Sequence, residues 1–345
     1  MNREELDKLV KYQIITDAFD YQELDPDIVE KYKYFEDKFN ELLAEKANQF
    51  KLKDCHFVIK NHSYCNAFAR TVKGYNIIGI TTGYTIQMHN IFDQKNIIHI
   101  LLIALMGDQQ LSHAYADLYN LENFELNKFM LNCSIQFTFS HEFRHILQFN
   151  SSKISVDYYR NENLDHSTFE MKKHAWEFDA DRMASFEVMK YIFKMKRKYQ
   201  VNDDNIFKCM LYTGLGSIFI TKVFFYFRFE TSKLDLNKID FYTKKYSHPH
   251  PIVRMFNIID YFYDNITDFF PKLEVTKQDF LNNALGIIKL YFFYYQPNRN
   301  IIAEILNDID NHLNEINDYN EELFEFAIND TAIVNLLNAS GTNFH

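Results

Sequence analysis

The scarcity of proline and glycine is the feature that most limits how this chain can fold. Its 345 residues include only 5 prolines and 8 glycines. These residue types mark turns and interrupt regular structure, so their scarcity favours long helices over a many-stranded sheet. Hydrophobic residues make up 47% of the chain, which is enough to bury a large core. We therefore expect a mainly α protein with a small β-sheet, an α+β fold.

Apolar periodicity predicts where the helices lie. Asp25-Pro26 is typical of an N-cap followed by a proline in the first turn, and it predicts a helix that ends near Gln49. The other predicted helices span 97–106, 127–150, 170–199, 205–229, 251–263, 278–295 and 301–316. We expect one main domain over residues 1–270 and a helical appendage over residues 271–345.

One region has the pattern of strands. Residues 55–59, 65–72 and 75–81 are predicted strands, and Lys73-Gly74 is the turn between the last two. This is the region in which we expect the small sheet.

Charge and cysteine content restrict the class of protein. The net charge of -10 argues against a nucleic-acid binder, which needs a basic face. The four cysteines include no CxxC pair, and the charged residues 1–7 do not form a signal sequence, so we expect a cytoplasmic protein. The apolar stretch 211–229 contains Lys222 and Arg228, which favours a buried core helix without membrane contact. The oligomeric state is left open.

Residues 141–145 read His-Glu-Phe-Arg-His, an HExxH motif inside a predicted helix. Histidines four residues apart project from one helix face and can share a metal ion. Glu142 flanks such an ion and can accept a proton from the water that the metal activates. His141 and His145 are therefore candidate ligands, and Glu142 is the candidate general base.

A catalytic zinc site uses three protein ligands and one water, so a third ligand is needed. The predicted helix 170–199 offers Glu177 and, one turn later, Asp181. We predict that Glu177 is the third ligand and that Asp181 accepts a hydrogen bond from a ligand histidine, which fixes its ring. His174 and Asp179 are the competing candidates for the third ligand.

Two prolines hold His248 and His250 in an extended loop that leads into the predicted helix 251–263. One of these histidines can stabilise the oxyanion of a tetrahedral intermediate or occupy the open metal position. The sequence does not decide which one reaches the site. Arg254 can pair with the acidic residues or with the intermediate.

A predicted strand before the active helix carries a candidate substrate-binding segment. It consists of Asn66, Ala67, Phe68 and Ala69. An extended peptide can be held against an exposed strand by backbone hydrogen bonds, and small side chains permit its close approach.

In this order, the four segments resemble the gluzincin zinc metallopeptidases of the HtpX and CAAX prenyl protease type. They match an NAFA-like strand, an HExxH helix, an ExxxD helix and an HPxPxxR-like turn at 66–69, 141–145, 177–181 and 248–254. The resemblance covers roughly residues 30 to 265. It implies a zincin-like fold, one Zn²⁺ per chain bound by His141, His145 and Glu177, and endopeptidase activity with Glu142 as general base.

Several features depart from this family pattern. The family has glycine directly before the second histidine, where this chain has Arg144, which can narrow the site or pair with an acidic residue. The segment 84–126 is longer than the usual connection, and the region beyond Pro271 has no counterpart. Many members carry transmembrane helices or a signal peptide, and this sequence shows neither.

The sequence thus predicts a zinc endopeptidase that acts on proteins or peptides. One alternative is a non-catalytic helical interaction protein in which four protein ligands close a stabilising zinc site. Another is a helical interaction module without metal. The extra histidines and Arg144 suggest a narrower hypothesis, a latent enzyme that needs a trigger. A related divalent ion could use the same ligands, although two histidines and a glutamate favour zinc.

Overall fold

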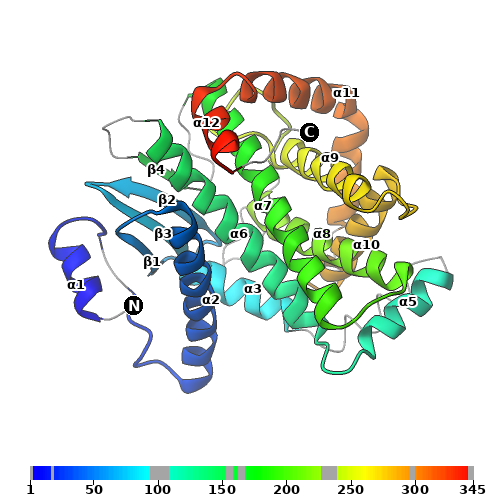
Figure 1. Cartoon of the computed structure of the whole chain (residues 1–345), viewed down its shortest axis with the longest axis horizontal. Coiled ribbons are helices and arrows are strands. Elements are labelled where there is room, and N and C mark those ends of the chain that lie inside the picture. The colour runs from blue at the N-terminus through cyan, green and yellow to red at the C-terminus, as the bar shows by residue number, and fades with distance from the viewer. Residues whose placement is uncertain are drawn as a thin grey trace.

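The computed structural model describes residues 3–16, 19–93, 109–152, 158–161, 168–226, 239–295 and 300–340. The protein is mainly helical with one small sheet, as predicted (Figure 1). The predicted helix 97–106 and the end of the predicted helix 205–229 lie outside the described residues.

Most of the described helices coincide with the predicted ones. Their bounds are α1 (Arg3–Lys11), α2 (Pro26–Phe50), α3 (Thr82–Phe92), α5 (Gln109–Tyr119), α6 (Leu126–Ser151), α7 (Met171–Lys198), α8 (Asp204–Tyr226), α9 (Pro251–Phe269), α10 (Lys277–Tyr295), α11 (Ile301–Ala327) and α12 (Thr331–Ser340). Helices α1, α3, α5 and α12 were not predicted, and α11 continues beyond its predicted end at residue 316.

The sheet is mixed and has the strand order β1-β3-β2-β4. Its strands are β1 (Cys55–Lys60), β2 (Ala67–Val72), β3 (Tyr75–Thr81) and β4 (Tyr158–Asn161). β1 runs parallel to β3, whereas β2 is antiparallel to both β3 and β4. Lys73 and Gly74 both have positive φ, as a two-residue hairpin turn of type I′ requires. The predicted hairpin is confirmed, and β4 was not predicted.

Side chains alternate between the two faces of this sheet. Ile59 and Ala69 belong to the main hydrophobic core, which also contains residues of α2 and α6. Val58 and Phe68 point the other way into a smaller cluster with Leu9 of α1. The sheet is therefore buried on both faces over these strands.

Helices α6 and α7 lie side by side in the middle of the molecule (Figure 1). α6 packs against β2 and α8, while α7 also packs against α9 and α11. The main core continues past Pro271 and includes Phe280 and Tyr319. The division into residues 1–270 and 271–345 stays a prediction.

Helix α8 is the described helix that is long and apolar enough to cross a membrane, over residues 204–224. Other parts of the protein bury 89% of its most apolar window, which is the environment of a core helix.

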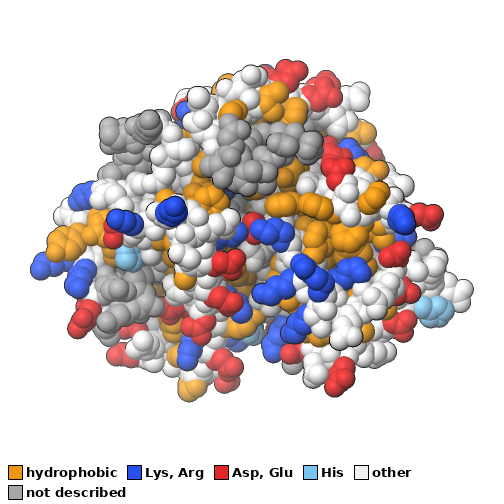
Figure 2. Space-filling model, viewed as in Figure 1, with side chains coloured by type: hydrophobic (Ala, Val, Ile, Leu, Met, Phe, Trp, Pro, Cys, Tyr) orange, Lys and Arg blue, Asp and Glu red, His pale blue; other side chains and the backbone are white. Residues whose placement is uncertain are grey.

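On the outer surface, acidic and basic side chains are interspersed over the face that Figure 2 shows.

Candidate metal centre

Helix α6 presents both motif histidines to the interior. His141 and His145 are 1% exposed, and their Nε2 atoms lie 3.1 Å apart. Phe137 and Phe149, one turn before and one turn after, stack against the two imidazole rings. The i, i+4 spacing therefore produces one stripe in which aromatic rings hold the histidines in place. Glu142 is also buried on this helix.

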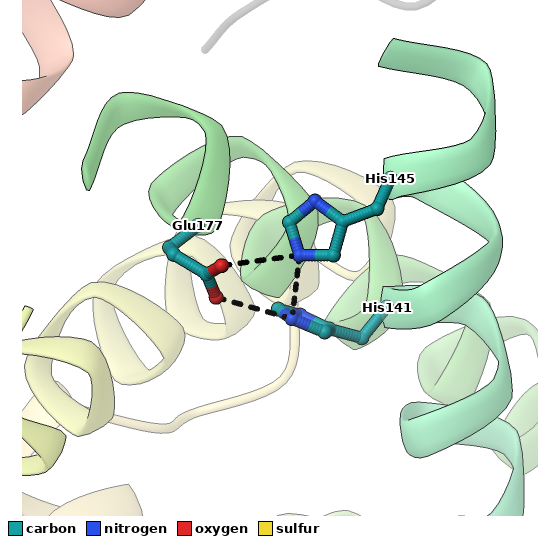
Figure 3. Close-up of side chains that lie close together, drawn as sticks. All are labelled: His141, His145 and Glu177. Carbon is teal, nitrogen blue, oxygen red and sulfur yellow. Dashed lines mark hydrogen bonds and ion pairs between the residues drawn. The ribbon is translucent and has the colours of Figure 1, made fainter. Parts of the chain in front are cut away.

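Glu177 of α7 completes the group (Figure 3). Its Oε1 lies 3.2 Å from His145 Nε2, and its Oε2 lies 3.2 Å from His141 Nε2. Tetrahedral ligands at zinc–ligand distances of about 2.0–2.1 Å are separated by about 3.3–3.4 Å. The three buried side chains could therefore hold a metal ion between them.

The Glu177 carboxylate is stabilised in its charged form. Burial opposes ionisation, but His145, His248, Arg254 and His141 outweigh it and hold the pKa of Glu177 well below its usual range. An ionised carboxylate is the form that binds a metal ion.

Asp181 lies one turn after Glu177 and meets three cationic or hydrogen-bonding side chains. Its Oδ1 lies 3.0 Å from His141 Nδ1. Arg254 donates from Nε at 2.6 Å and from Nη2 at 2.8 Å, and Lys222 Nζ lies 3.3 Å away. Burial acts to raise the pKa of Asp181, but Arg254 and Lys222 hold it below the usual range. Asp181 is therefore ionised, and its carboxylate faces Nδ1 of His141, the ring nitrogen on the side away from Glu177.

The two loop histidines point in different directions. His248 Nε2 lies 3.4 Å from Glu177 Oε1, and its Nδ1 contacts Ser247 Oγ at 2.9 Å. His250 instead caps α9, where its Nδ1 accepts a hydrogen bond from Ile252 N. The structure therefore brings His248, and not His250, beside the candidate ligands.

Of the remaining predicted residues, Arg254 contacts the candidate ligands, whereas Arg144, Asp179 and His174 pair elsewhere. Arg254 Nη2 also lies 3.1 Å from Glu177 Oε2. Arg144 points away from the ligands and forms a bidentate ion pair with Asp179, at 2.7 and 2.8 Å. His174 contacts the Tyr246 carbonyl and the Tyr319 hydroxyl. Asp179 and His174, the competing candidates, are thus both engaged elsewhere.

The candidate substrate segment lies inside the sheet and not at an exposed edge. β2 pairs with β3 from Ala67 to Val72 and with β4 from Phe68 to Thr71. Asn66 precedes the strand and is buried, like Ala67, Phe68 and Ala69. β2 is thus an interior strand, and the short strand β4 occupies its second edge. Its role in substrate binding stays a prediction.

Sequence reasoning missed two polar residues next to the site. Lys222 reaches Asp181 from α8, and the sequence signal for it was a lysine within the apolar stretch of that helix. Gln148 contacts His145 Nδ1 at 2.7 Å, and its position one turn after the HExxH motif is the sequence feature that could have identified it. Both belong to helices that the sequence did predict.

No family model matches this sequence, and no curated protein or solved structure matches it either.

Proposed function

We propose that this protein is a cytoplasmic, zinc-dependent endopeptidase of the HtpX and CAAX prenyl protease type, with a zincin-like fold and one Zn²⁺ per chain. The observation that carries the proposal is the buried group of His141, His145 and Glu177, whose facing nitrogen and oxygen atoms lie 3.1–3.2 Å apart. Glu142, next to the first ligand, gives this site a candidate base. Its substrates are proteins or peptides.

A zinc ion held by these side chains supplies Lewis acidity, which lowers the pKa of a water ligand toward about 7 and polarises a carbonyl group. Glu142 accepts the proton of the attacking water and passes it to the leaving amine. Ser247 Oγ can donate to His248 Nδ1, which leaves a proton on Nε2 facing the site. His248 can then donate to the developing oxyanion.

Arg254 supports this chemistry through position. Its bidentate contact with Asp181 fixes the guanidinium beside Glu177 Oε2. Asp181 in turn accepts from His141 Nδ1, which leaves His141 Nε2 free of its proton and able to bind a metal. Arg254 is therefore a positioning residue that can also contact the intermediate.

The first experiment measures metal content by elemental analysis of the wild type, Glu177→Ala and Glu142→Gln. We expect one zinc per chain in the wild type, its loss in Glu177→Ala and its retention in Glu142→Gln. Glu322→Ala, which changes a half-exposed glutamate far from the motif in sequence, is the matched control and should keep its zinc. A folded wild type without bound metal would contradict the proposal.

Peptide hydrolysis then separates the base from the ligands. Loss of a general base lowers the rate about 10²- to 10⁴-fold, so zinc-loaded Glu142→Gln should be nearly inactive on an unfolded protein substrate. Equal activity of this variant and the wild type would exclude Glu142 as the base.

A second candidate is a non-catalytic zinc-stabilised interaction protein in which His248 closes the site. The distance of 3.4 Å between His248 Nε2 and Glu177 Oε1 favours it. Among the described residues, however, His248 is not part of the group whose ligand atoms all lie within 4.8 Å of one another. His248→Ala distinguishes the two: the endopeptidase keeps its zinc and loses activity, whereas a closed structural site loses zinc.

A further inference from the structure

A buried polar network joins α6 to α7 behind the candidate ligand His145. Gln148 lies one turn after His145, and its Oε1 lies 2.7 Å from His145 Nδ1. Its Nε2 donates to the Trp176 carbonyl at 3.0 Å and to Asp179 Oδ2 at 2.8 Å. Gln148 is fully buried, so each of these contacts is shielded from water.

The two contacts on α7 determine which way the Gln148 amide points. A backbone carbonyl and a carboxylate both accept hydrogen bonds, so the group facing them must be the NH₂. A flipped amide would set its oxygen against two other oxygens in a buried environment, which is costly. The Gln148 oxygen therefore faces His145 Nδ1.

The partner of Asp179 fixes the far end of the network. Arg144 donates to both carboxylate oxygens of Asp179, at 2.7 and 2.8 Å. Arg144 is 3% exposed and Asp179 is 1% exposed. A buried bidentate pair of this kind has a defined geometry, so Asp179 is a rigid acceptor for Gln148.

An acceptor at Nδ1 determines the tautomer of a neutral imidazole. In a neutral ring, Nδ1 carries the proton and donates a hydrogen bond to Gln148, and Nε2 keeps its lone pair. That lone pair points toward the site, since Nε2 lies 3.2 Å from Glu177 Oε1 and 3.1 Å from His141 Nε2. This is the form in which a histidine binds a metal ion.

We propose that Gln148, held by Asp179 and Arg144, is a positioning residue that sets the tautomer and ring orientation of His145 as a metal ligand. The two ligand histidines then have different outer partners. His141 faces the carboxylate of Asp181, whereas His145 faces a neutral amide. Arg144, in the position where the resembled family has glycine, anchors the amide and leaves the ligand group unobstructed. The metal-binding part of this inference rests on the proposed function.

The first test measures zinc affinity by competition with a chelator, for the wild type, Gln148→Leu and the matched control Gln136→Leu. Gln136 lies on the same helix and contacts Ser140, outside the network. Loss of such an outer partner lowers metal affinity about 10- to 100-fold, so we expect this loss in Gln148→Leu alone. A folded Gln148→Leu protein with unchanged zinc affinity would overturn the proposal.

The second test needs no metal and observes the wild-type ring directly. Histidine-selective ¹⁵N labelling and long-range ¹H–¹⁵N NMR report the tautomer of each neutral imidazole in chelator-treated wild-type protein. We expect a proton on Nδ1 of His145, whether the ring is neutral or carries a second proton on Nε2 beside Glu177. A His145→Asn sample identifies the His145 signals. An Nε2–H tautomer would overturn the role of Gln148. Absence of zinc binding, by contrast, would reject the endopeptidase while the tautomer result still stood.

Discussion

Asp181 gives the sharpest test of how the buried charges stabilise this protein. Its carboxylate is 0% exposed and faces Arg254, Lys222 and His141. Asp181→Asn keeps the size of the side chain but removes its charge. Arg254 then retains Glu177 as an anionic neighbour, at 3.1 Å, while Lys222 loses its ion pair with Asp181.

Breaking a buried ion pair by removing one partner costs about 3–5 kcal/mol. Asparagine still offers one acceptor oxygen, so we expect a loss at the lower end, about 3 kcal/mol of the free energy of unfolding. The matched control is Glu322→Gln, because its pair with Lys244 is 2.7 Å long but about half exposed. Such surface pairs contribute about 0–1 kcal/mol.

Urea unfolding of chelator-treated proteins measures both changes. The only tryptophan, Trp176, is buried on α7 near the site, so its fluorescence reports this region and far-UV circular dichroism reports the helices. A lower midpoint with an unchanged slope indicates lost stability. The double variant Asp181→Asn/Lys222→Met should recover part of the loss, since it also removes a buried cation. A loss below about 1 kcal/mol in Asp181→Asn would refute this reasoning.

Four further predictions concern single residues. Burial acts to raise the pKa of Asp181, but Arg254 and Lys222 lower it below its usual range. The charged carboxylate therefore stabilises the protein above about pH 4, and this stabilisation is lost as the pH falls toward the folded-state pKa. Acid unfolding should accordingly be steeper in the wild type than in Asp181→Asn. Cys55 is half-buried while the other three free cysteines are buried, so native protein should incorporate one equivalent of iodoacetamide, as peptide mass spectrometry can verify. Gly286→Ala should raise stability by about 0.5–1 kcal/mol because a helical Cβ meets nothing there. Gly83→Ala should lower stability by about 1–3 kcal/mol, because its Cβ would lie 2.2 Å from the Ser63 carbonyl oxygen; thermal melts compare the two glycine variants.

Local spacing explains why part of the site was predictable. His141 and His145 share a helix face, and Glu177 begins the acidic ExxxD stretch of the predicted helix 170–199. Each of these signals lies within one or two turns of chain. The hairpin was predictable for the same reason, since Lys73-Gly74 supplies the positive φ values that the turn requires.

The missed features depend on contacts between distant segments. β4 is a short, polar strand that forms only where β2 offers an unpaired edge. Gln148 gains its role from Trp176 and Asp179 on another helix, and Lys222 gains its role from Asp181. Periodicity predicts that these helices exist, but it does not give the orientation in which they pack. That is why Arg144 could be assigned a pairing role without its partner being known.

The buried charges of this centre serve more than stability. Replacing a buried ionic cluster by apolar side chains is often neutral or stabilising, so stability alone does not explain it. Helix α7 supplies two carboxylates, Glu177 and Asp181. His141 of α6, Lys222 of α8 and Arg254 of α9 surround them. Apolar side chains can pack in several arrangements, whereas bidentate ion pairs permit few. The same contacts that orient the candidate ligands therefore also fix how the four helices pack, so we expect a change at Asp181 to alter both unfolding and the zinc binding that we propose for this site.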